Sequence, residues 1–148
     1  MTNDDYIKIE FPSRSVNESF ARATVAAFAA RLDPTLEELA DIKTAVSEAV
    51  TNCIVHAYPG ELGTIWLRAR ILEENTLEIS IRDAGIGIYD VKKAREPMFT
   101  TGGEDRSGMG FTIMESFMDK VKVRSVEGKG TSVTMTRRII RRISKYDC

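Results

Sequence analysis

A strand that runs directly into an Asp-x-Gly-x-Gly turn places the strongest constraint on how this chain can fold. From Leu77 to Ile81, apolar and polar residues alternate, a pattern that predicts a half-buried β-strand. Asp83 ends this strand, so its carboxylate is held in one place and can accept a hydrogen bond from a ligand amine. Gly85 and Gly87 allow a sharp turn and the close approach of a flat ligand. Taken alone, such residues more often form only a turn, so the interpretation depends on the other motifs.

Chain length and composition predict a single globular domain that spans residues 1–148. Apolar residues make up 43% of the chain and charged residues 29%, both ordinary for a folded soluble protein. The formal net charge of −1 argues against a dedicated nucleic-acid binder. With one histidine and two cysteines, Cys53 and Cys148, we expect neither a disulfide framework nor a structural zinc site.

The sequence also carries no signal for export or membrane insertion. Its first residues are polar and acidic, unlike those of a signal peptide, and its apolar runs are too short to span a bilayer. We therefore expect a cytoplasmic protein without a membrane partner.

An Ala-rich helix is predicted after a short strand at residues 6–11. It is expected to begin at Ser15, which forms a capping-box pattern with Glu18, and to end near Leu32. Arg22 follows Glu18 by four residues, and this spacing alone favours a weak surface ion pair over a functional role. The predicted buried stripe of this helix consists of Val16, Phe20, Ala23 and Ala27.

A second helix is expected to begin with Asp33 as N-cap and Pro34 in its first turn, and to extend to Ala57. Polar residues recur along one side of it at four-residue spacing: Glu48, Asn52 and His56. One interpretation of this stripe is an ordinary solvated edge. The other is the wall of a site that offers a carboxylate base and an amide oxygen for a metal ion.

The remainder of the chain is predicted to alternate strands with one long loop and one helix. Residues 89–106 form a polar connection of a length that usually indicates a lid or disorder. The sequence from Ser107 to Gly110 then opens a helix, where backbone N–H groups can face an anion. Four strands are predicted, at residues 62–72, 77–81, 121–126 and 131–140.

The order of these motifs suits phosphoryl transfer from a nucleotide. One carboxylate can bind an adenine amine, glycine-lined backbone can hold phosphates, and an amide oxygen can bind Mg²⁺. A further carboxylate can accept the proton of the phosphate acceptor, and a mobile flap can exclude water. The chain has neither a P-loop sequence nor a complete Rossmann glycine motif.

In this order the motifs resemble the boxes of the ATPase/kinase superfamily that includes gyrase, Hsp90, histidine kinases and MutL, known as the GHKL or Bergerat type. Residues 48–52 match its N box, residues 83–87 its first glycine box, residues 108–110 its second, and residues 128–131 its last box. The resemblance implies a two-layer α/β sandwich, with helices on one face of a mixed sheet and ATP held between a helix and a lid.

A closer resemblance is to the bacterial anti-sigma factor serine kinases, in particular those of the sporulation type. It rests on residues 17–22, 47–52 and 106–114, and it extends over essentially the whole chain. This resemblance implies binding of ATP or ADP with Mg²⁺, and a homodimer. It also implies two protein partners, the sporulation sigma factor (sigma F) and an anti-anti-sigma protein that is the phosphorylation substrate.

The resemblance further implies a role for each matching residue. Glu48 would be the general base on the acceptor serine, and Asn52 would bind Mg²⁺. Asp83 would bind the adenine amino group, with Thr131 supporting the adenine end. Arg22 would contact the sigma factor and the antagonist in turn.

Further residues of the glycine boxes and the lid would complete the nucleotide site. Relatives often carry a lysine after the Thr-Thr pair of the lid, whereas Gly102 and Gly103 follow it here. Arg106 is therefore the candidate phosphate contact and is grouped with the catalytic residues. The other expected nucleotide-binding residues are Gly85, Gly87, Thr100, Thr101, Ser107, Gly108, Met109 and Gly110.

These inferences predict a serine kinase that also sequesters sigma F and thereby controls sporulation transcription. One alternative is a nucleotide-gated binding module without kinase activity, although a module of that kind has no use for Glu48. A second is the general-stress type of anti-sigma kinase, which binds another sigma factor. A third is a histidine-kinase catalytic domain, which needs a phosphoacceptor histidine outside the N-box helix.

Overall fold

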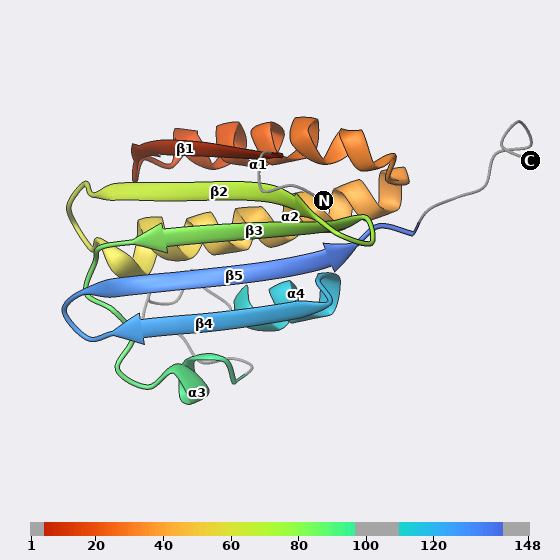
Figure 1. The fold of residues 1–148 in the computed structure, drawn as a ribbon. Coiled ribbons are helices and arrows are strands. Elements are labelled where there is room, and N and C mark those ends of the chain that lie inside the picture. Colours follow the sequence, from red (N-terminus) through yellow and green to blue (C-terminus); the bar gives the residue numbers. More distant parts are fainter. Residues whose placement is uncertain (1–4, 97–109, 141–148) are drawn as a thin grey trace, which may run out of the picture.

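The computed structural model describes residues 5–96 and 110–140, which form a five-stranded sheet with helices packed against it (Figure 1). The strands lie in the order β1-β2-β3-β5-β4. Their bounds are Tyr6–Pro12 for β1, Thr64–Leu72 for β2, Thr76–Asp83 for β3, Lys120–Val126 for β4 and Gly130–Arg138 for β5. The helices are α1 (Val16–Ala29), α2 (Leu36–Asn52), the short α3 (Val91–Ala94) and α4 (Gly110–Phe117).

Every strand pairing among the described residues is antiparallel, which corrects the mixed sheet that the family resemblance implied. β3 and β4 do run in the same direction, as is usual for two strands joined through a helix. However, β5 lies between them and pairs with both, so no parallel pair forms.

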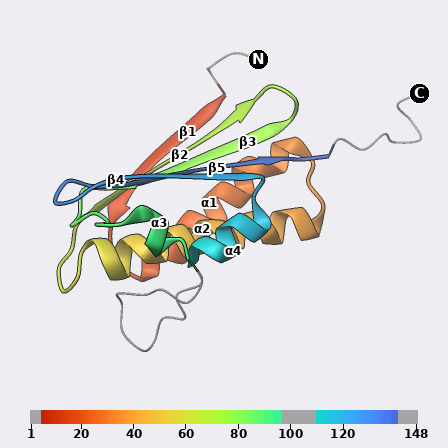
Figure 2. The same ribbon diagram turned by 90° about the horizontal axis from the view of Figure 1, so that it is seen from below.

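The helices α1, α2 and α4 lie on one side of the sheet, and no helix of the described residues covers the other side (Figure 2). This arrangement confirms the two-layer α/β sandwich. The short α3 contacts the edge strand β4.

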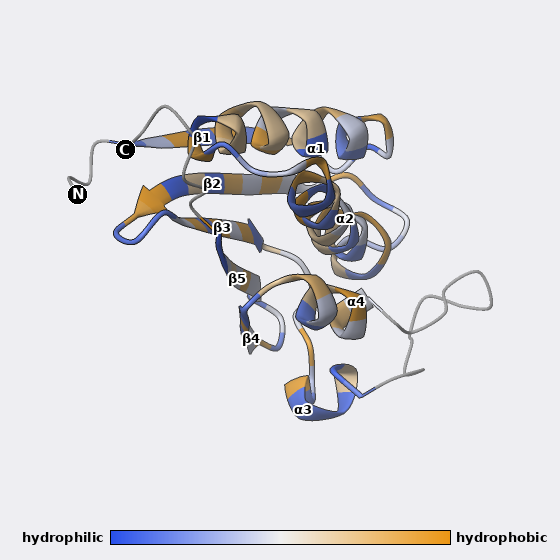
Figure 3. Ribbon diagram, turned by 90° about the vertical axis from the view of Figure 1, so that its right-hand side faces the viewer, coloured by the Kyte–Doolittle hydropathy of each residue, from blue (hydrophilic) through white to orange (hydrophobic). Residues whose placement is uncertain are grey.

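Alternation along the strands directs apolar side chains toward the helices. In β2, Ile65, Leu67 and Ala69 are fully buried, while Trp66 and Arg68 between them are half-buried on the open side. Figure 3 shows this alternation as bands of contrasting hydropathy along β2. Burial of each large aliphatic side chain contributes about 1.5–3 kcal/mol, so this shared core holds the two layers together. The helical layer contributes, among others, Val25, Ile42, Val46, Val50 and Met114.

α1 buries a different face from the predicted one. Val16 and Phe20 are 66% and 55% exposed, and the other two residues of the predicted stripe are exposed as well. The helix carries apolar residues on two faces, and each face has one valine, one phenylalanine and two alanines. Local pattern therefore cannot choose between them, and the packing of α1 against α2 decides which face is buried. The residues buried instead are Ala21, Val25, Phe28 and Ala29.

One predicted helix cap is right in position and the other is wrong. Ser15 is the N-cap of α1, as predicted, but it has helical backbone angles and makes no side-chain capping bond, so the predicted capping box does not form. Asp33 does not cap α2 and adopts a left-handed conformation with φ of 54°. The cap of α2 is Thr35, whose Oγ1 accepts a hydrogen bond from the Glu38 backbone N–H at 3.0 Å. Glu38 Oε1 accepts in return from the Thr35 backbone N–H at 2.8 Å, which completes a capping box.

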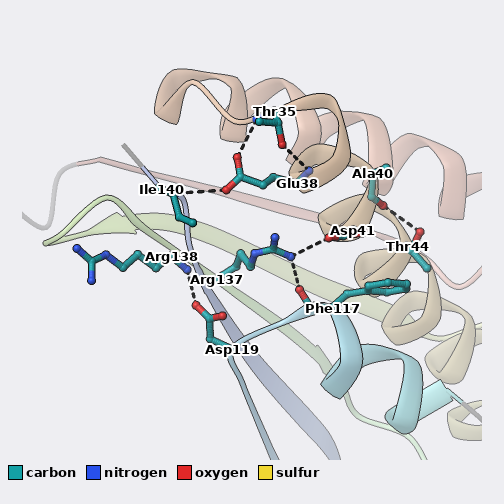
Figure 4. Close-up of polar contacts among 10 residues, drawn as sticks. All are labelled: Thr35, Glu38, Ala40, Asp41, Thr44, Phe117, Asp119, Arg137, Arg138 and Ile140. Carbon is teal, nitrogen blue, oxygen red and sulfur yellow. Dashed lines mark hydrogen bonds and ion pairs between the residues drawn. The ribbon is translucent and has the colours of Figure 1, made fainter. Parts of the chain in front are cut away.

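Arg137 joins the end of β5 to the helical layer (Figure 4). Its guanidinium donates to Asp41 Oδ2 on α2 at 3.1 Å and to the backbone oxygen of Phe117 at the end of α4. Close by, Glu38 Oε2 accepts from the Ile140 backbone N–H at 3.3 Å. These contacts fix the C-terminal end of α4. They thereby constrain the position of Gly110, the first residue of this helix.

Replacing Arg137 with alanine is expected to lower the free energy of unfolding by about 1.5–3 kcal/mol, because the hydrogen bonds that it loses involve a charged group and leave Asp41 without this partner. Urea unfolding followed by circular dichroism measures the change. Arg138→Ala is the matched control, because the Arg138 side chain is exposed and its substitution should cost less than about 0.5 kcal/mol. Equal losses in the two variants would contradict a linking role for Arg137.

Candidate functional site

A cavity of about 540 Å³ opens between the end of α2, the start of α4 and the strands β3 and β5. It is large enough for a ligand of nucleotide size. The sequence motifs that were far apart in the chain meet here. Predicted site residues on its wall are Asn52, Asp83, Gly87, Gly110 and Thr131.

Asp83 is the fixed point of this cavity. Its side chain is 6% exposed, and one carboxylate oxygen, Oδ1, accepts two backbone hydrogen bonds. The donors are the N–H of Gly85 at 3.0 Å and the N–H of Thr131 at 3.1 Å. The Thr131 backbone thus supports Asp83 directly, while its Oγ1 lies 2.9 Å from Ser125 Oγ. With Oδ1 held in this way, the carboxylate has one orientation in the cavity wall.

Cys53 lies against Asp83 and also lines the cavity. Burial above all, and then the charge of the Asp83 carboxylate with its hydrogen bond to the thiol, raise the pKa of Cys53 well above its usual value. The thiol is therefore protonated at neutral pH and can donate to Asp83. The sequence predicts neither a disulfide framework nor a zinc site from its two cysteines, and it gives no sign of this contact.

The two glycines of the first box are required by the protein's own backbone. A Cβ on Gly85 would lie 2.2 Å from the backbone oxygen of Ala57, and one on Gly87 would lie 2.4 Å from that of Val126. Gly87 also has φ of +79°, which side chains disfavour. The sequence interpretation assigned these glycines to a close approach of ligand, but the segments that approach closely here are the end of the α2 region and the β4–β5 turn.

The chain stays helical beyond Asn52 as predicted, but residues Cys53–Ala57 form a π-helical turn rather than a continued α-helix. Such turns widen a helix and occur frequently at functional sites. The Ala57 backbone oxygen accepts a hydrogen bond from the Ile86 N–H at 3.0 Å. The end of the N-box helix is thereby attached to the first glycine box. His56, on this turn, lines the cavity.

Tyr58 and Ser125 are structural residues of the site that the sequence analysis missed. Tyr58 Oη accepts from the Ala84 N–H at 2.6 Å and donates to the Thr64 backbone oxygen at 2.7 Å. Burial is the main cause that raises the pKa of Tyr58 above its usual value. Ser125 Oγ accepts from the Ile88 N–H at 2.7 Å. Neither residue belongs to a recognisable motif, and only the three-dimensional structure places their hydroxyls beside the glycine box.

Glu48, Asn52 and Gly110 come together where α2 meets the start of α4. A Cβ placed on Gly110 would lie 3.3 Å from both side-chain polar atoms of Asn52 and 3.4 Å from Glu48 Oε2. The N box and the end of the second glycine box are therefore neighbours. A larger residue than glycine would occupy the space in front of this carboxylate and amide.

Arg22 lies apart from the cavity, on α1. Its Nη1 atom is 3.6 Å from Glu18 Oε1, and the two side chains are 39% and 23% exposed, so this ion pair contributes little to stability. The surrounding surface, which forms a shallow groove, includes Asn17, Phe20 and Lys43.

The remaining predicted site residues lie outside the described residues: Thr100, Thr101, Arg106, Ser107, Gly108 and Met109.

Within residues 5–96 and 110–140, no three carboxylate, histidine or cysteine side chains are grouped so that they could hold a metal ion by themselves. A cation that binds Asn52 would therefore need ligands from a nucleotide and from water, as is usual for Mg²⁺. In the same part of the chain, no helix is both long and apolar enough to cross a membrane.

Comparison with known proteins agrees with this geometry. Residues 11–137 match the model of the histidine kinase-like ATPase domain. The chain is 58% identical to the anti-sigma F factor of Caldanaerobacter subterraneus subsp. tengcongensis, over 94% of this chain and 97% of that protein. It is 56% identical to the anti-sigma F factor of Bacillus cereus, over 88% and 90% of the two chains.

Among solved structures, the fold is similar to that of the RsbU and RsbW domains of a Mycobacterium tuberculosis protein, with a TM-score of 0.67 and 20% identity over 90% of this chain and 32% of that one. A histidine kinase domain from Erythrobacter litoralis gives a TM-score of 0.57 at 20% identity, over 82% of this chain and 60% of the other. At these identities the likeness shows a shared fold. The family match and the identities above establish more: the chain belongs to the histidine kinase-like ATPase domain family and, within it, to the anti-sigma F factors.

Proposed function

We propose that this protein sequesters sigma F and that, as a serine kinase, it uses Mg-ATP to phosphorylate a serine of an anti-anti-sigma protein. The observation that carries the proposal is the meeting of Glu48 and Asn52 with Gly110 beside a cavity whose wall holds Asp83. The carboxylate that we propose for adenine binding and the one that we propose as the base thus lie in one continuous region. The names of the relatives supply the biological context, anti-sigma activity toward sigma F.

Asp83 is proposed to bind the adenine amino group. Oδ1 already accepts from two backbone N–H groups, so the other carboxylate oxygen has the greater remaining capacity to accept from a ligand amine, with the Cys53 thiol as a further donor to the carboxylate. Apolar side chains on the same cavity wall, including Ile81 and Ile88, suit the faces of a purine ring. Gly85, Gly87 and Thr131 act by holding Asp83 and the glycine loop in place.

Asn52 is proposed to bind Mg²⁺, with phosphate oxygens and waters completing its coordination. The amide oxygen is a ligand type that Mg²⁺ accepts, and Gly110 leaves the space beside it open. When bound, Mg²⁺ neutralises the charge that develops on the transferred phosphoryl group. Nearby, Glu48 accepts the proton of the acceptor serine hydroxyl as the serine oxygen attacks the γ-phosphorus of ATP. The bond between the γ-phosphorus and the β–γ bridging oxygen breaks, and ADP leaves.

The lid and the second glycine box are proposed to close over the phosphates. Arg106 would contact them and stabilise charge during transfer. The other contacts would come from Thr100, Thr101, Ser107, Gly108 and Met109.

The exposed side of α1 is proposed as the surface for protein partners, with Arg22 as a contact of both sigma F and the antagonist. Val16 and Phe20 leave apolar surface exposed on the same helix. We propose that the protein acts as a homodimer, as expected from the family resemblance.

Two alternatives are kept as outcomes of the experiments. A nucleotide-gated module without kinase activity would bind ATP and sigma F but transfer no phosphate. A general-stress type of kinase would prefer another sigma factor, and the naming of the relatives favours sigma F.

Glu48→Gln is expected to reduce phosphate transfer to the anti-anti-sigma protein by about 10²–10⁴-fold, because glutamine cannot accept a proton. ATP affinity should change little, since the substitution keeps the size of the side chain. Transfer is measured with purified protein, Mg-ATP and the partner, followed by mass spectrometry of the phosphorylated serine. Glu37→Gln, an exposed position in the first turn of the same helix, is the matched control. Transfer at the wild-type rate in Glu48→Gln would refute the base assignment.

Asp83→Asn is expected to weaken ATP binding by roughly 10- to 100-fold, because a charged hydrogen-bond acceptor for the adenine amine is replaced by an amide. The asparagine oxygen can still accept from Gly85 and Thr131, so the fold should persist. Isothermal titration with ATP and GTP measures the loss, and a thermal melt checks the fold. An unchanged ATP affinity would show that adenine lies elsewhere.

A further inference from the structure

The wall of the nucleotide cavity is acidic. Among the lining residues that the structure describes, three carry carboxylates, namely Asp83, Asp90 and Glu127, and one carries a cationic chain, Lys93. With His56 counted as neutral, the formal charge of this part of the wall is −2. ATP is a polyanion, so such a wall repels it unless positive charge lies close to the phosphates. The position of Lys93 therefore matters for binding.

Lys93 belongs to the short helix α3, which is attached to the elements around it. Arg95 donates to Glu115 Oε1 on α4 through Nε at 2.9 Å and through Nη2 at 2.6 Å. Its Nη2 also donates to the backbone oxygen of Val121 on β4 at 3.0 Å. Ala94 packs against the hydrophobic core. Figure 3 shows α3 below α4, so this helix has a fixed place beside the one whose start faces the cavity.

One side of α3 faces the cavity and another faces solvent. Asp90 Oδ1 caps the helix by accepting from the Lys93 backbone N–H at 3.1 Å. Asp90, Lys93 and Ala94 line the cavity, as expected for residues three and four positions apart on one helical face. Lys92 and Arg95, the neighbours of this pair, do not line it. The two adjacent lysines of α3 thus differ in position, and only Lys93 is on the cavity side.

The segment that carries Lys93 runs along the cavity from its proposed adenine end toward α4. Near the adenine end, the Ile88 N–H donates to Ser125 Oγ at 2.7 Å. At the other end, Arg95 is held to α4 by Glu115. Lys93 comes five residues after Ile88 and two before Arg95, so it lies on the α4 side of the segment. The phosphates are proposed to lie on this side, beside the N box and the start of α4.

We propose that Lys93 binds the phosphates of the adenine nucleotide. This inference rests on the proposed function, since it requires that the cavity hold ATP or ADP, and it adds a residue that belongs to none of the sequence motifs. The ammonium group donates to phosphate oxygens and acts as a compact charge on a flexible stem, which allows it to follow the ligand. It also offsets the carboxylates of the wall.

The plain alternative is that both lysines of α3 are ordinary solvated side chains. Both are exposed, and each would then contribute equally to the general field around the cavity. A direct contact predicts instead that Lys93 matters and Lys92 does not. It also predicts that the effect of Lys93 depends on the phosphates of the ligand.

Lys93→Gln is expected to weaken the binding of ATP and ADP by about 5- to 20-fold at 50 mM salt, because a charged donor to phosphate is lost. Adenosine affinity should not change, since adenosine has no phosphate. The loss should shrink at 500 mM salt, where an exposed charge is screened. Lys93→Arg should retain most of the affinity. Isothermal titration of the full-length protein measures ATP and ADP, and displacement of a fluorescent ADP analogue measures adenosine.

The matched control is Lys92→Gln, which removes the same charge from the same helical turn and should bind all three ligands as the wild type does. A thermal melt without ligand checks the fold of each variant. Unchanged ATP affinity in Lys93→Gln overturns the inference, as does an equal loss in Lys92→Gln or an equal loss for adenosine. A wild-type protein that binds neither ATP nor ADP would instead overturn the proposed function itself, so the two failures are distinguishable.

Discussion

Two hydrogen bonds to one oxygen of Asp83 hold the functional end of this molecule together. They join the end of β3 to its own glycine loop and to the first residues of β5, through the backbone N–H groups of Gly85 and Thr131. Because a buried carboxylate is stable only with such partners, the position of the loop and the orientation of the acid are determined together. The Ala57–Ile86 bond then attaches this unit to the end of the N-box helix. The cavity is therefore a consequence of backbone connections, and the ligand-facing groups depend on them.

Asp83, Glu48 and Asn52 could be found from the sequence because their chemistry requires particular residue types at fixed spacings beside them. Asp83 before two glycines is ambiguous alone, but it gains meaning when Glu48 and Asn52 precede it at helical spacing and a second glycine box follows. Tyr58 and Ser125 had no such signal, since their hydroxyls act on the backbone of segments distant in sequence. Cavity residues that work through long-range contacts are thus invisible to spacing arguments.

The errors in the helices have a common physical origin. Local patterns specify that a helix forms, but more than one start and more than one buried face are compatible with them. In α1, packing buried the face with Val25 and Phe28 and left the similar face with Val16 and Phe20 exposed, and this outcome depends on α2 and the sheet. At the start of α2, the capping box of Thr35 and Glu38 satisfied more backbone donors than Asp33 could. The mixed sheet was wrong because strand order is a property of the whole chain.

A two-layer sandwich leaves one sheet face without helices, and the sequence decides what that face can do. Side chains alternate between the two faces along a β-strand, so every second strand residue points to the open face. The charge of this face is therefore set by positions that are never adjacent in the chain. Lys8, Arg68 and Lys122 lie in one row although more than a hundred positions separate the first from the last. Net charge cannot detect such an arrangement. The strand register can, because it divides a balanced composition into one basic face and an acidic remainder.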